Sequence, residues 1–335
     1  MSERHSESPA VVPVPVGREL SSGRSLTAEA RWYLAKTASG IDTGEAEGGS
    51  LDASLNASRL KYDEQGANLS GECRVDCHVS EYRLSGQGPR VRVYHPDVLP
   101  PTPALLYLHG GGWVRGSLES HDAVCRAIAA ASGWVVVAPD YRLAPENPFP
   151  AALHDAWQTF QWILAGAKVD LDCGTVAVAG DSAGGALAAV IARWARDHSG
   201  QQMAAQLLIY PVVEYEFSRP SMARNARGYG LTREALASYW RLYTRNAKER
   251  HHPDASPMAA GNLAELPDTL LVTAGFDILR DQGQAYANRL QESGVAVEYL
   301  DFPHMVHGFV RGIGQMESAD VLLATIARFL RERSP

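Results

Sequence analysis

Cysteine is scarce in this sequence: four residues in 335 are too few for a disulfide scaffold. No apolar run approaches the ~20 residues that span a bilayer, and the opening MSERHSESPA lacks the apolar core of a secretory signal. Basic residues are in the minority, since 31 Lys and Arg face 38 Asp and Glu and leave a formal net charge of −7. Such a chain is a poor candidate for binding nucleic acid or anionic lipid through its overall field. We therefore expect a cytoplasmic protein without a membrane anchor or a nucleic-acid partner.

The rest of the composition is that of an ordinary globular protein. Hydrophobic residues make up 45% and charged residues 21%, with 30 glycines and 19 prolines. These proportions argue against disorder, collagen and coiled coil. At roughly 150 residues per domain the length suggests two domains, but α/β enzymes often hold about 200–250 residues in one.

From residue 104 onward, apolar runs alternate with helical patterns. The runs lie at 104–110, 134–140, 175–181, 206–212, 269–277 and 295–301. The helical patterns, most of which close on glycine, lie at 121–133, 150–167, 183–200 and 281–294, and a last one covers 319–333. Near-continuous apolar strands separated by helices predict a mostly parallel sheet with both faces covered.

The N-terminal part of the chain does not follow this alternation. Residues 1–24 mix serine, proline, valine and charge without a period, which predicts a loosely docked arm. A helix is predicted over 27–39, and the Gly-, Ser-, Asp- and Asn-rich stretch 40–58 predicts a loop. Two strand-like pieces follow at 77–84 and 90–95.

A second irregular segment, residues 214–247, lies between two predicted strands and is longer than a plain helical connection. After an irregular start it becomes amphipathic, with Leu236, Tyr239, Trp240 and Tyr243 at helical spacing on one side. Insertions at strand ends of such sheets usually build lids over sites. An ordinary helix with an aromatic core face would show the same pattern, so both interpretations stay open.

Gly180-Asp181-Ser182-Ala183-Gly184-Gly185 is the sharpest motif in the sequence. It follows the apolar run TVAVA and leads directly into a helix of small residues. A serine on a tight strand-to-helix turn is strained and exposes its hydroxyl, and flanking glycines remove the Cβ clashes of that turn. The helix N-terminus also favours a developing negative charge. The pattern predicts a nucleophilic serine at position 182.

Three successive glycines follow His109 at the end of the predicted strand 104–110. Glycines let backbone N–H groups turn towards one point, as acyl transfer requires for the oxyanion of its tetrahedral intermediate. A flexible loop or a phosphate cradle are the alternatives. A phosphate loop normally ends in Gly-Lys-Ser/Thr, which is absent here.

A serine nucleophile needs a base, and the base needs an orienting acid. In sheets of this kind the chain order is Ser, then Asp or Glu, then His. Asp277 closes a predicted strand and is the better acid, whereas Asp281 is expected to brace the loop or open the next helix. His304 and His307 both lie beyond the last predicted strand. Spacing alone leaves the two histidines nearly even, although Gly308 favours His307.

Five motifs in one order carry a family resemblance: HGGGW, DYRLAPE, GDSAGG, GFDILRD and HGF, beginning at residues 109, 140, 180, 275 and 307. They resemble the bacterial hormone-sensitive-lipase-like esterases, the family IV carboxylesterases, from about residue 85 to the C-terminus. The resemblance implies an α/β-hydrolase fold: a mostly parallel sheet flanked by helices, with a discontinuous helical cap. It also implies carboxylesterase activity on short acyl chains without a cofactor.

By this resemblance Ser182, Asp277 and His307 are the catalytic triad. Gly111, Gly112 and the N–H of Ala183 form the oxyanion hole. The expected organisation is an N-terminal arm and cap helices over 1–58, a catalytic domain in two parts over 59–213 and 248–335, and a cap insertion over 214–247. Plant hormone receptors on the same fold lack the catalytic histidine, and this chain keeps it.

The expected substrate is a small ester with a short to medium acyl chain. The residues expected to line its pocket are aromatic: Trp113, Tyr215, Phe217 and Trp240. An amidase, lactonase or deacetylase with the same triad is the alternative within enzymes, and a non-catalytic small-ligand receptor is the alternative outside them. A homodimer is a candidate assembly. No metal is expected, because Cys73, Cys77 and His78 lack two further ligands at zinc-like spacing.

Overall fold

The computed structural model describes residues 25–37, 51–69, 75, 77–86, 88–98, 102–166 and 171–334. The predicted arm over 1–24 lies outside these ranges, as does Cys73. Within them, no helix combines the length and the apolar character that crossing a bilayer would need.

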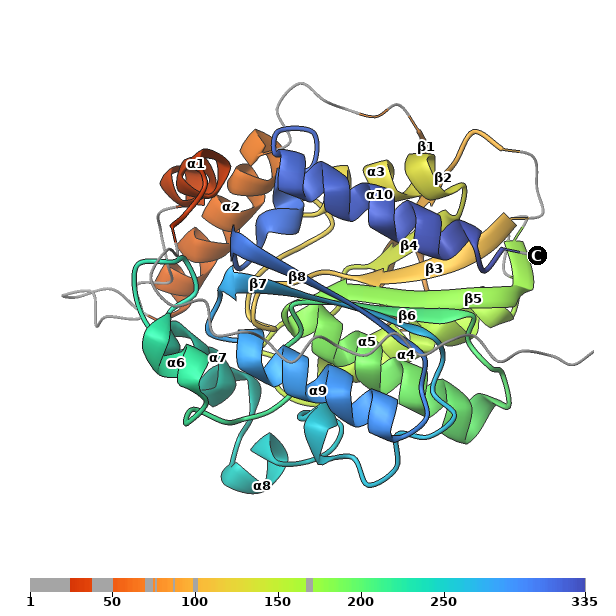
Figure 1. The fold of residues 1–335 in the computed structure, drawn as a ribbon. Coiled ribbons are helices and arrows are strands. Elements are labelled where there is room, and N and C mark those ends of the chain that lie inside the picture. Colours follow the sequence, from red (N-terminus) through yellow and green to blue (C-terminus); the bar gives the residue numbers. More distant parts are fainter. Residues whose placement is uncertain are drawn as a thin grey trace, which may run out of the picture.

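Eight strands form one sheet in the order β1-β2-β4-β3-β5-β6-β7-β8 (Figure 1). Their bounds are β1 His78–Arg83, β2 Arg90–His95, β3 Thr102–Leu108, β4 Val135–Pro139, β5 Leu171–Asp181, β6 Ala205–Ile209, β7 Thr269–Phe276 and β8 Val297–Val306. Only the β1–β2 and β2–β4 pairs in this sheet are antiparallel. The predicted mostly parallel sheet is confirmed.

Helices cover both faces of the sheet, which explains why its strands are near-continuous apolar runs. The helices α3 (Asp122–Ser132) and α10 (Glu317–Arg331) lie on one face, where Leu105 and Tyr107 of β3 point. On the opposite face lie α4 Ala151–Leu164, α5 Ala183–Trp194 and α9 Arg280–Glu292 (Figure 1). There they pack on Leu106 and Leu108. Successive β3 side chains therefore enter two separate cores.

Most of the remaining helices gather at the end of the sheet where β7 terminates, at the left of Figure 1, while the short α8 lies at the bottom of that view, below α9. They are α1 Ala28–Thr37, α2 Leu51–Leu69, α6 Pro220–Arg224, α7 Arg233–Tyr243 and α8 Ala247–Arg250. A π-turn at Ala195–Ser199 extends α5, and short 3₁₀ turns occupy Pro257–Ala259 and Phe309–Gly312. The carboxyl ends of parallel strands are where sites form in open α/β sheets, so these helices stand over the expected site.

The predicted loop over 40–58 is wrong for its last part, because 51–58 belong to α2. The buried apolar residues Leu55, Tyr62 and Leu69 recur every seventh position. One apolar residue per two turns is too narrow a stripe to be recognised as an amphipathic helix. The predicted boundary at residue 58 thus falls inside α2. The helix α6 likewise lies in a stretch predicted to be irregular, and α8 begins at the predicted boundary of 247.

Strand β8 continues five residues beyond its predicted end at 301, to Val306. His304 therefore lies within the strand and not after it. The segment contains Pro303 and no regular alternation, which hides it from strand rules. It is an edge strand, where proline is tolerated.

Candidate active site

Ser182 occupies the turn between β5 and α5 with φ 56° and ψ −119°, a left-handed conformation that is strained for a residue with a Cβ. The flanking glycines are required by close contacts. A Cβ on Gly180 would lie 2.3 Å from the carbonyl oxygen of Gly184, and a Cβ on Gly184 would lie 2.0 Å from that of Leu108. The end of β3 and the start of α5 therefore meet at the serine, as a nucleophile turn requires.

The glycine loop after β3 stands beside this turn. Gly111 and Gly112 have φ of 125° and 66°, values that glycine adopts freely. Within the described ranges, the amides of Gly111, Gly112 and Ala183 donate to no acceptor. Unpaired amides at the N-terminus of a helix and in a glycine loop can stabilise an oxyanion.

Asp181 links the glycine loop to the turn that carries Ser182. Its Oδ1 accepts hydrogen bonds from the Gly110 amide at 2.9 Å and the Tyr107 hydroxyl at 3.0 Å, and it lies 3.2 Å from Nε2 of His121. Burial disfavours the charge of Asp181, but His121 and these hydrogen bonds outweigh it and lower the pKa of the carboxyl below its usual value. Because Asp181 directly precedes Ser182 in the chain, its ionised carboxylate holds the glycine loop beside the serine. The sequence reading did not single it out.

His109 is held neutral in the same buried region. Its ring stacks on Tyr141 with centroids 4.1 Å apart, and Nδ1 lies 2.8 Å from the carbonyl oxygen of Gly110. Burial, together with nearby His121, lowers the pKa of His109 to about 3. In the unfolded chain a histidine ionises near pH ~6.5. The stabilisation from a neutral His109 is therefore complete above that pH and is lost as the pH falls towards 3.

We expect the free energy of unfolding to decrease below pH 6.5, with His109 contributing a slope of up to about 1.4 kcal/mol per pH unit. In His109→Asn the side chain cannot ionise, so this part of the slope should disappear. Urea unfolding of both proteins between pH 7 and pH 4.5 measures it. Equal slopes in the two proteins would show that His109 does not resist protonation.

His307 links the nucleophile to an acid. Its Nε2 lies 2.8 Å from Oγ of Ser182, and its Nδ1 lies 2.6 Å from Oδ2 of Asp277. Asp277, 1% exposed, follows β7 directly, and its Oδ1 accepts a hydrogen bond from the Leu279 amide at 2.9 Å. Gly308 has φ 88°, so the chain turns sharply after His307. The structure brings these three predicted residues into one hydrogen-bonded chain.

The two competing candidates lie elsewhere. His304 is exposed on β8, and its Nδ1 lies 3.1 Å from the carbonyl oxygen of Ser25. Asp281 lies in the first turn of α9 and accepts a hydrogen bond from the Ser221 amide at 2.7 Å. Asp281 therefore braces the start of α6, and neither residue contacts Ser182.

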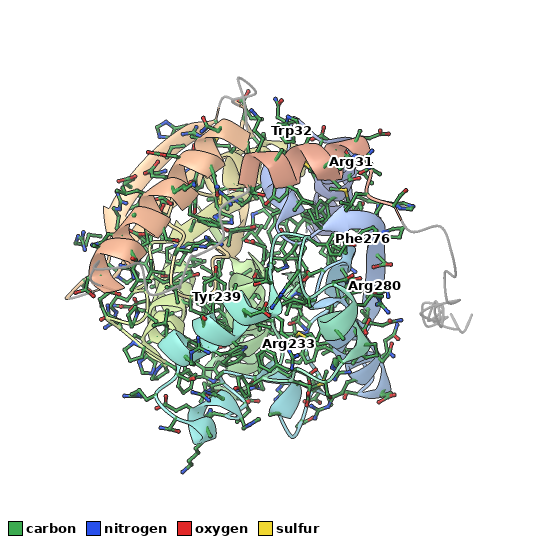
Figure 2. All side chains as sticks on the ribbon, turned by 90° about the vertical axis from the view of Figure 1, so that its left-hand side faces the viewer. Arg31, Trp32, Arg233, Tyr239, Phe276 and Arg280 are labelled. Atoms are coloured by element: carbon green, nitrogen blue, oxygen red, sulfur yellow. The ribbon has the colours of Figure 1, made fainter. Side chains whose placement is uncertain are left out.

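A cavity of about 90 Å³ opens above Ser182 and His307. Its floor includes Gly111 and Gly112. Much of the rest of its wall comes from side chains of α1, α2 and α7: Tyr33, Thr37, Tyr62, Gln65, Ala235, Leu236 and Tyr239. Figure 2 looks onto this end of the molecule, with Tyr239 near the centre of the view. The reacting groups therefore lie beneath two separate parts of the chain.

Of the four aromatic residues predicted to line the pocket, only Trp113 is in the cavity wall. Trp240 packs against Trp113 with ring centroids 4.9 Å apart, and Tyr215 packs on Trp240 at 5.5 Å and on Phe217 at 5.1 Å. These three form a cluster behind Trp113. On α7, Tyr239 faces the cavity and the next residue, Trp240, faces this cluster, so the helix contributes both to the cavity wall and to the core.

Most residues of the cavity wall were not predicted from the sequence. Tyr33 and Tyr62 come from helices with little amphipathic signal, and Tyr33 donates a hydrogen bond to the carbonyl oxygen of Gly308 at 2.6 Å. Arg115 and Arg311 also line the cavity. The sequence feature that the two arginines share is their position, because each follows a predicted site residue, Gly111 or His307, by four residues.

Comparisons with known proteins agree with this architecture. The family described as the alpha/beta hydrolase fold matches residues 105–311. The esterase LipI of Mycobacterium tuberculosis is 45% identical over 235 residues, which cover 68% of this chain and 73% of that protein. The ethyl acetate hydrolase of Pseudomonas putida is 36% identical over 285 residues, which cover 82% and 89%.

Solved structures extend the likeness to the whole fold. A thermophilic and thermostable carboxylesterase cloned from a metagenomic library superimposes with a TM-score of 0.79 at 37% identity, covering 85% of this chain and 99% of that chain. A thermostable esterase from Pseudomonas putida covers 93% and 99%, with a TM-score of 0.81 at 30% identity. Because similarity of sequence and of fold extends over most of the chain, it belongs to the hormone-sensitive-lipase-like carboxylesterases of the α/β-hydrolase fold.

Proposed function

We propose that this carboxylesterase hydrolyses short- to medium-chain esters through an acyl-enzyme on Ser182. His307 acts as the base, Asp277 orients it, and Gly111, Gly112 and Ala183 hold the oxyanion. The observation that carries the proposal is the unbroken chain of contacts, 2.8 Å from Ser182 to His307 and 2.6 Å from His307 to Asp277. Nucleophile, base and orienting acid at hydrogen-bond distance are the arrangement that activates a serine.

The reaction then has two halves. The Oγ of Ser182 bonds to the ester carbonyl carbon while its proton passes to Nε2 of His307, and the carbonyl oxygen becomes an oxyanion. When the tetrahedral intermediate collapses, the ester C–O bond breaks and the proton of His307 passes to the departing alcohol. Water gives a proton to His307, attacks the acyl-enzyme and releases the acid, and the proton returns to Ser182.

The cavity walls support the expected acyl length. Tyr33, Tyr62 and Tyr239 are large, buried side chains in the wall of the cavity that contains Ser182. Among similar proteins, that of Pseudomonas putida is named for ethyl acetate, an ester with a two-carbon acyl group. A walled cavity accepts an acyl chain only until it is full.

We expect kcat/KM for p-nitrophenyl esters to pass through a maximum between acetyl and octanoyl. Each methylene that enters the cavity contributes about 0.8 kcal/mol, close to fourfold in rate. A carbon beyond the limit must displace packed side chains and costs ~1–3 kcal/mol. The measurement is a series of acyl lengths beside an emulsified triglyceride. A steady rise into long chains, or a jump in activity at the lipid surface, contradicts a closed cavity.

Covalent labelling tests the acyl-enzyme itself. A p-nitrophenyl phosphonate should release one equivalent of p-nitrophenol, and its phosphonyl group should appear by mass spectrometry on the peptide that contains Ser182. Esters and matched anilides, assayed together, separate an esterase from an amidase. A label on another residue, or no label with full ester hydrolysis, would refute the proposal. A homodimer and a cytoplasmic location stay predictions.

A further inference from the structure

Two arginines share the cavity with the proposed catalytic groups. Arg115 and Arg311 both belong to its wall, together with Ser182 and His307. Each follows a site residue by four positions, Arg115 after Gly111 in the glycine loop and Arg311 after His307 in the 3₁₀ turn. Their guanidinium groups are thus carried by the same loops that would bind the oxyanion and supply the base.

Neither arginine forms an ion pair within the described residues, although Asp181 and Asp63 interact with the charge of Arg311 from a longer distance. No carboxylate oxygen there lies within 4.0 Å of either guanidinium, and the Nε of each is buried without an acceptor. Arg311 is only 3% exposed, and its Nη2 donates to the carbonyl oxygen of Tyr62 at 2.7 Å. By contrast, Arg92, the other arginine that is almost fully buried, pairs with three carboxylates at 2.6–3.0 Å.

Both cations lie against the same aromatic ring. Cζ of Arg115 is 4.4 Å, and Cζ of Arg311 is 3.8 Å, from the centroid of the Tyr62 ring. Cζ of Arg115 also lies 5.7 Å from the centroid of the Tyr239 ring. An aromatic face attracts a cation, but it compensates only part of the cost of taking a charge out of water. Buried charges are ordinarily paired, so the buried Arg311 beside the half-buried Arg115 leaves the described part of the wall short of an anion.

The nearby carboxylates that the structure describes form no ion pair with either guanidinium and have other hydrogen-bond partners. Asp181 is the one acidic residue of the described cavity wall, and its Oδ1 is used by the Gly110 amide and the Tyr107 hydroxyl. Asp277 is hydrogen-bonded to His307 and the Leu279 amide. Asp63 of α2 accepts a hydrogen bond from the Ser117 hydroxyl at 2.8 Å. A negative charge on the substrate would supply the missing partner of the two arginines.

We propose that the preferred substrate is an ester carrying a second, ionised carboxylate, which Arg115 and Arg311 bind while Ser182 attacks the ester carbonyl. This inference rests on the proposed ester hydrolysis and names the substrate class for it. The guanidinium fork matches a planar carboxylate with two parallel hydrogen bonds, and a desolvated site strengthens them. The free carboxylate belongs either to the acyl part or to the alcohol part of the ester.

Two isosteric pairs of esters test the preference and separate these sources. For the acyl side, monoethyl adipate is compared with ethyl 6-methylheptanoate, and for the alcohol side 5-acetoxypentanoate is compared with 5-methylhexyl acetate. Each pair differs by a carboxylate against an isopropyl group, and the carboxylate is ionised at pH 7.5. We expect kcat/KM to be at least 10-fold higher for the charged member of one pair, and that pair identifies the side.

Variants assign the preference to the two arginines. In Arg115→Gln the ratio of kcat/KM values, charged over neutral, should fall at least 10-fold, and Arg115→Lys should retain more of it. Arg311→Lys serves as a second variant because it keeps the buried charge. The matched control is Arg227→Gln, which removes a positive charge from an 80% exposed side chain of the cap insertion and should change the ratio less than twofold.

The two proposals fail in different ways. If the neutral esters are hydrolysed and the charged member is equal or slower in both pairs, the carboxylate preference is wrong and ester hydrolysis stands. If none of the four esters nor p-nitrophenyl acetate is hydrolysed, the proposed function itself is wrong. A preference that persists undiminished in folded Arg115→Gln and Arg311→Lys would overturn the assignment to these arginines.

Discussion

Replacing Ser182 by alanine is expected to lower the turnover of p-nitrophenyl acetate by about 10⁶-fold, the usual cost of losing a triad serine. The hydroxyl is the atom that bonds to the carbonyl carbon, and His307 has nothing else to deprotonate at that place. Stability should change little, because alanine keeps the Cβ of Ser182 and the left-handed backbone is no worse for it. Initial rates and thermal unfolding of the same preparations measure the two effects.

Ser199→Ala is the matched control for this prediction. Ser199 lies in the π-turn at the far end of the helix that Ser182 begins. Its hydroxyl donates to the carbonyl oxygen of Ala195 at 2.6 Å and accepts from the Gln201 amide at 3.1 Å, far from the site. This variant should keep its activity within about twofold, since a surface change rarely exceeds ~0.5 kcal/mol. A loss smaller than about 10³-fold in folded Ser182→Ala would remove Ser182 from the role of nucleophile.

The two histidines of the PHMVH segment should separate by mutation. His307→Ala is expected to lower kcat by about 10⁵–10⁶-fold, because base and nucleophile act as a unit. His304→Ala should keep activity within a few-fold, since its exposed ring contacts the backbone of Ser25 and not the site. Steady-state kinetics and circular dichroism of both variants check the prediction. A folded, inactive His304→Ala beside an active His307→Ala would reverse the assignment.

The parts of the site that follow strand ends could be predicted from the sequence. Ser182, Asp277 and the glycine loop each come directly after an apolar run, and parallel strands bring their carboxyl ends to one edge. His307 is different, because its spacing in the sequence makes it almost as good a candidate for the base as His304. The strand β8 was predicted to stop at 301, and its true end at Val306 is what separates the two.

The cavity wall could not be predicted in the same way. Its residues on α1 and α2 sit on helices held by tertiary contacts, and a stripe of one apolar residue in seven gives almost no periodic signal. The amphipathic pattern of α7 can be recognised in the sequence, but helical spacing does not show which of two neighbouring aromatic residues faces the site. Tyr239 does so, whereas Trp240 packs behind Trp113. Nor does a sequence show whether the arginine at 115 or 311 has a carboxylate beside it.

Some contacts that hold α1 and α2 can form only after the C-terminal part of the chain has been synthesised. The Tyr33 hydroxyl reaches the carbonyl of Gly308 across 275 residues, and the Arg311 guanidinium reaches that of Tyr62 across 249. A ribosome adds about 5–20 residues per second, so these partners emerge roughly 12–55 s after the helices they hold. During that interval α2 can already pack through Arg59, which bonds to Val114, Ala144 and Glu146, but α1 and α2 still lack their contacts with the C-terminal part of the chain. A nascent chain truncated before residue 307 would lack the proposed base His307 and both of these contacts.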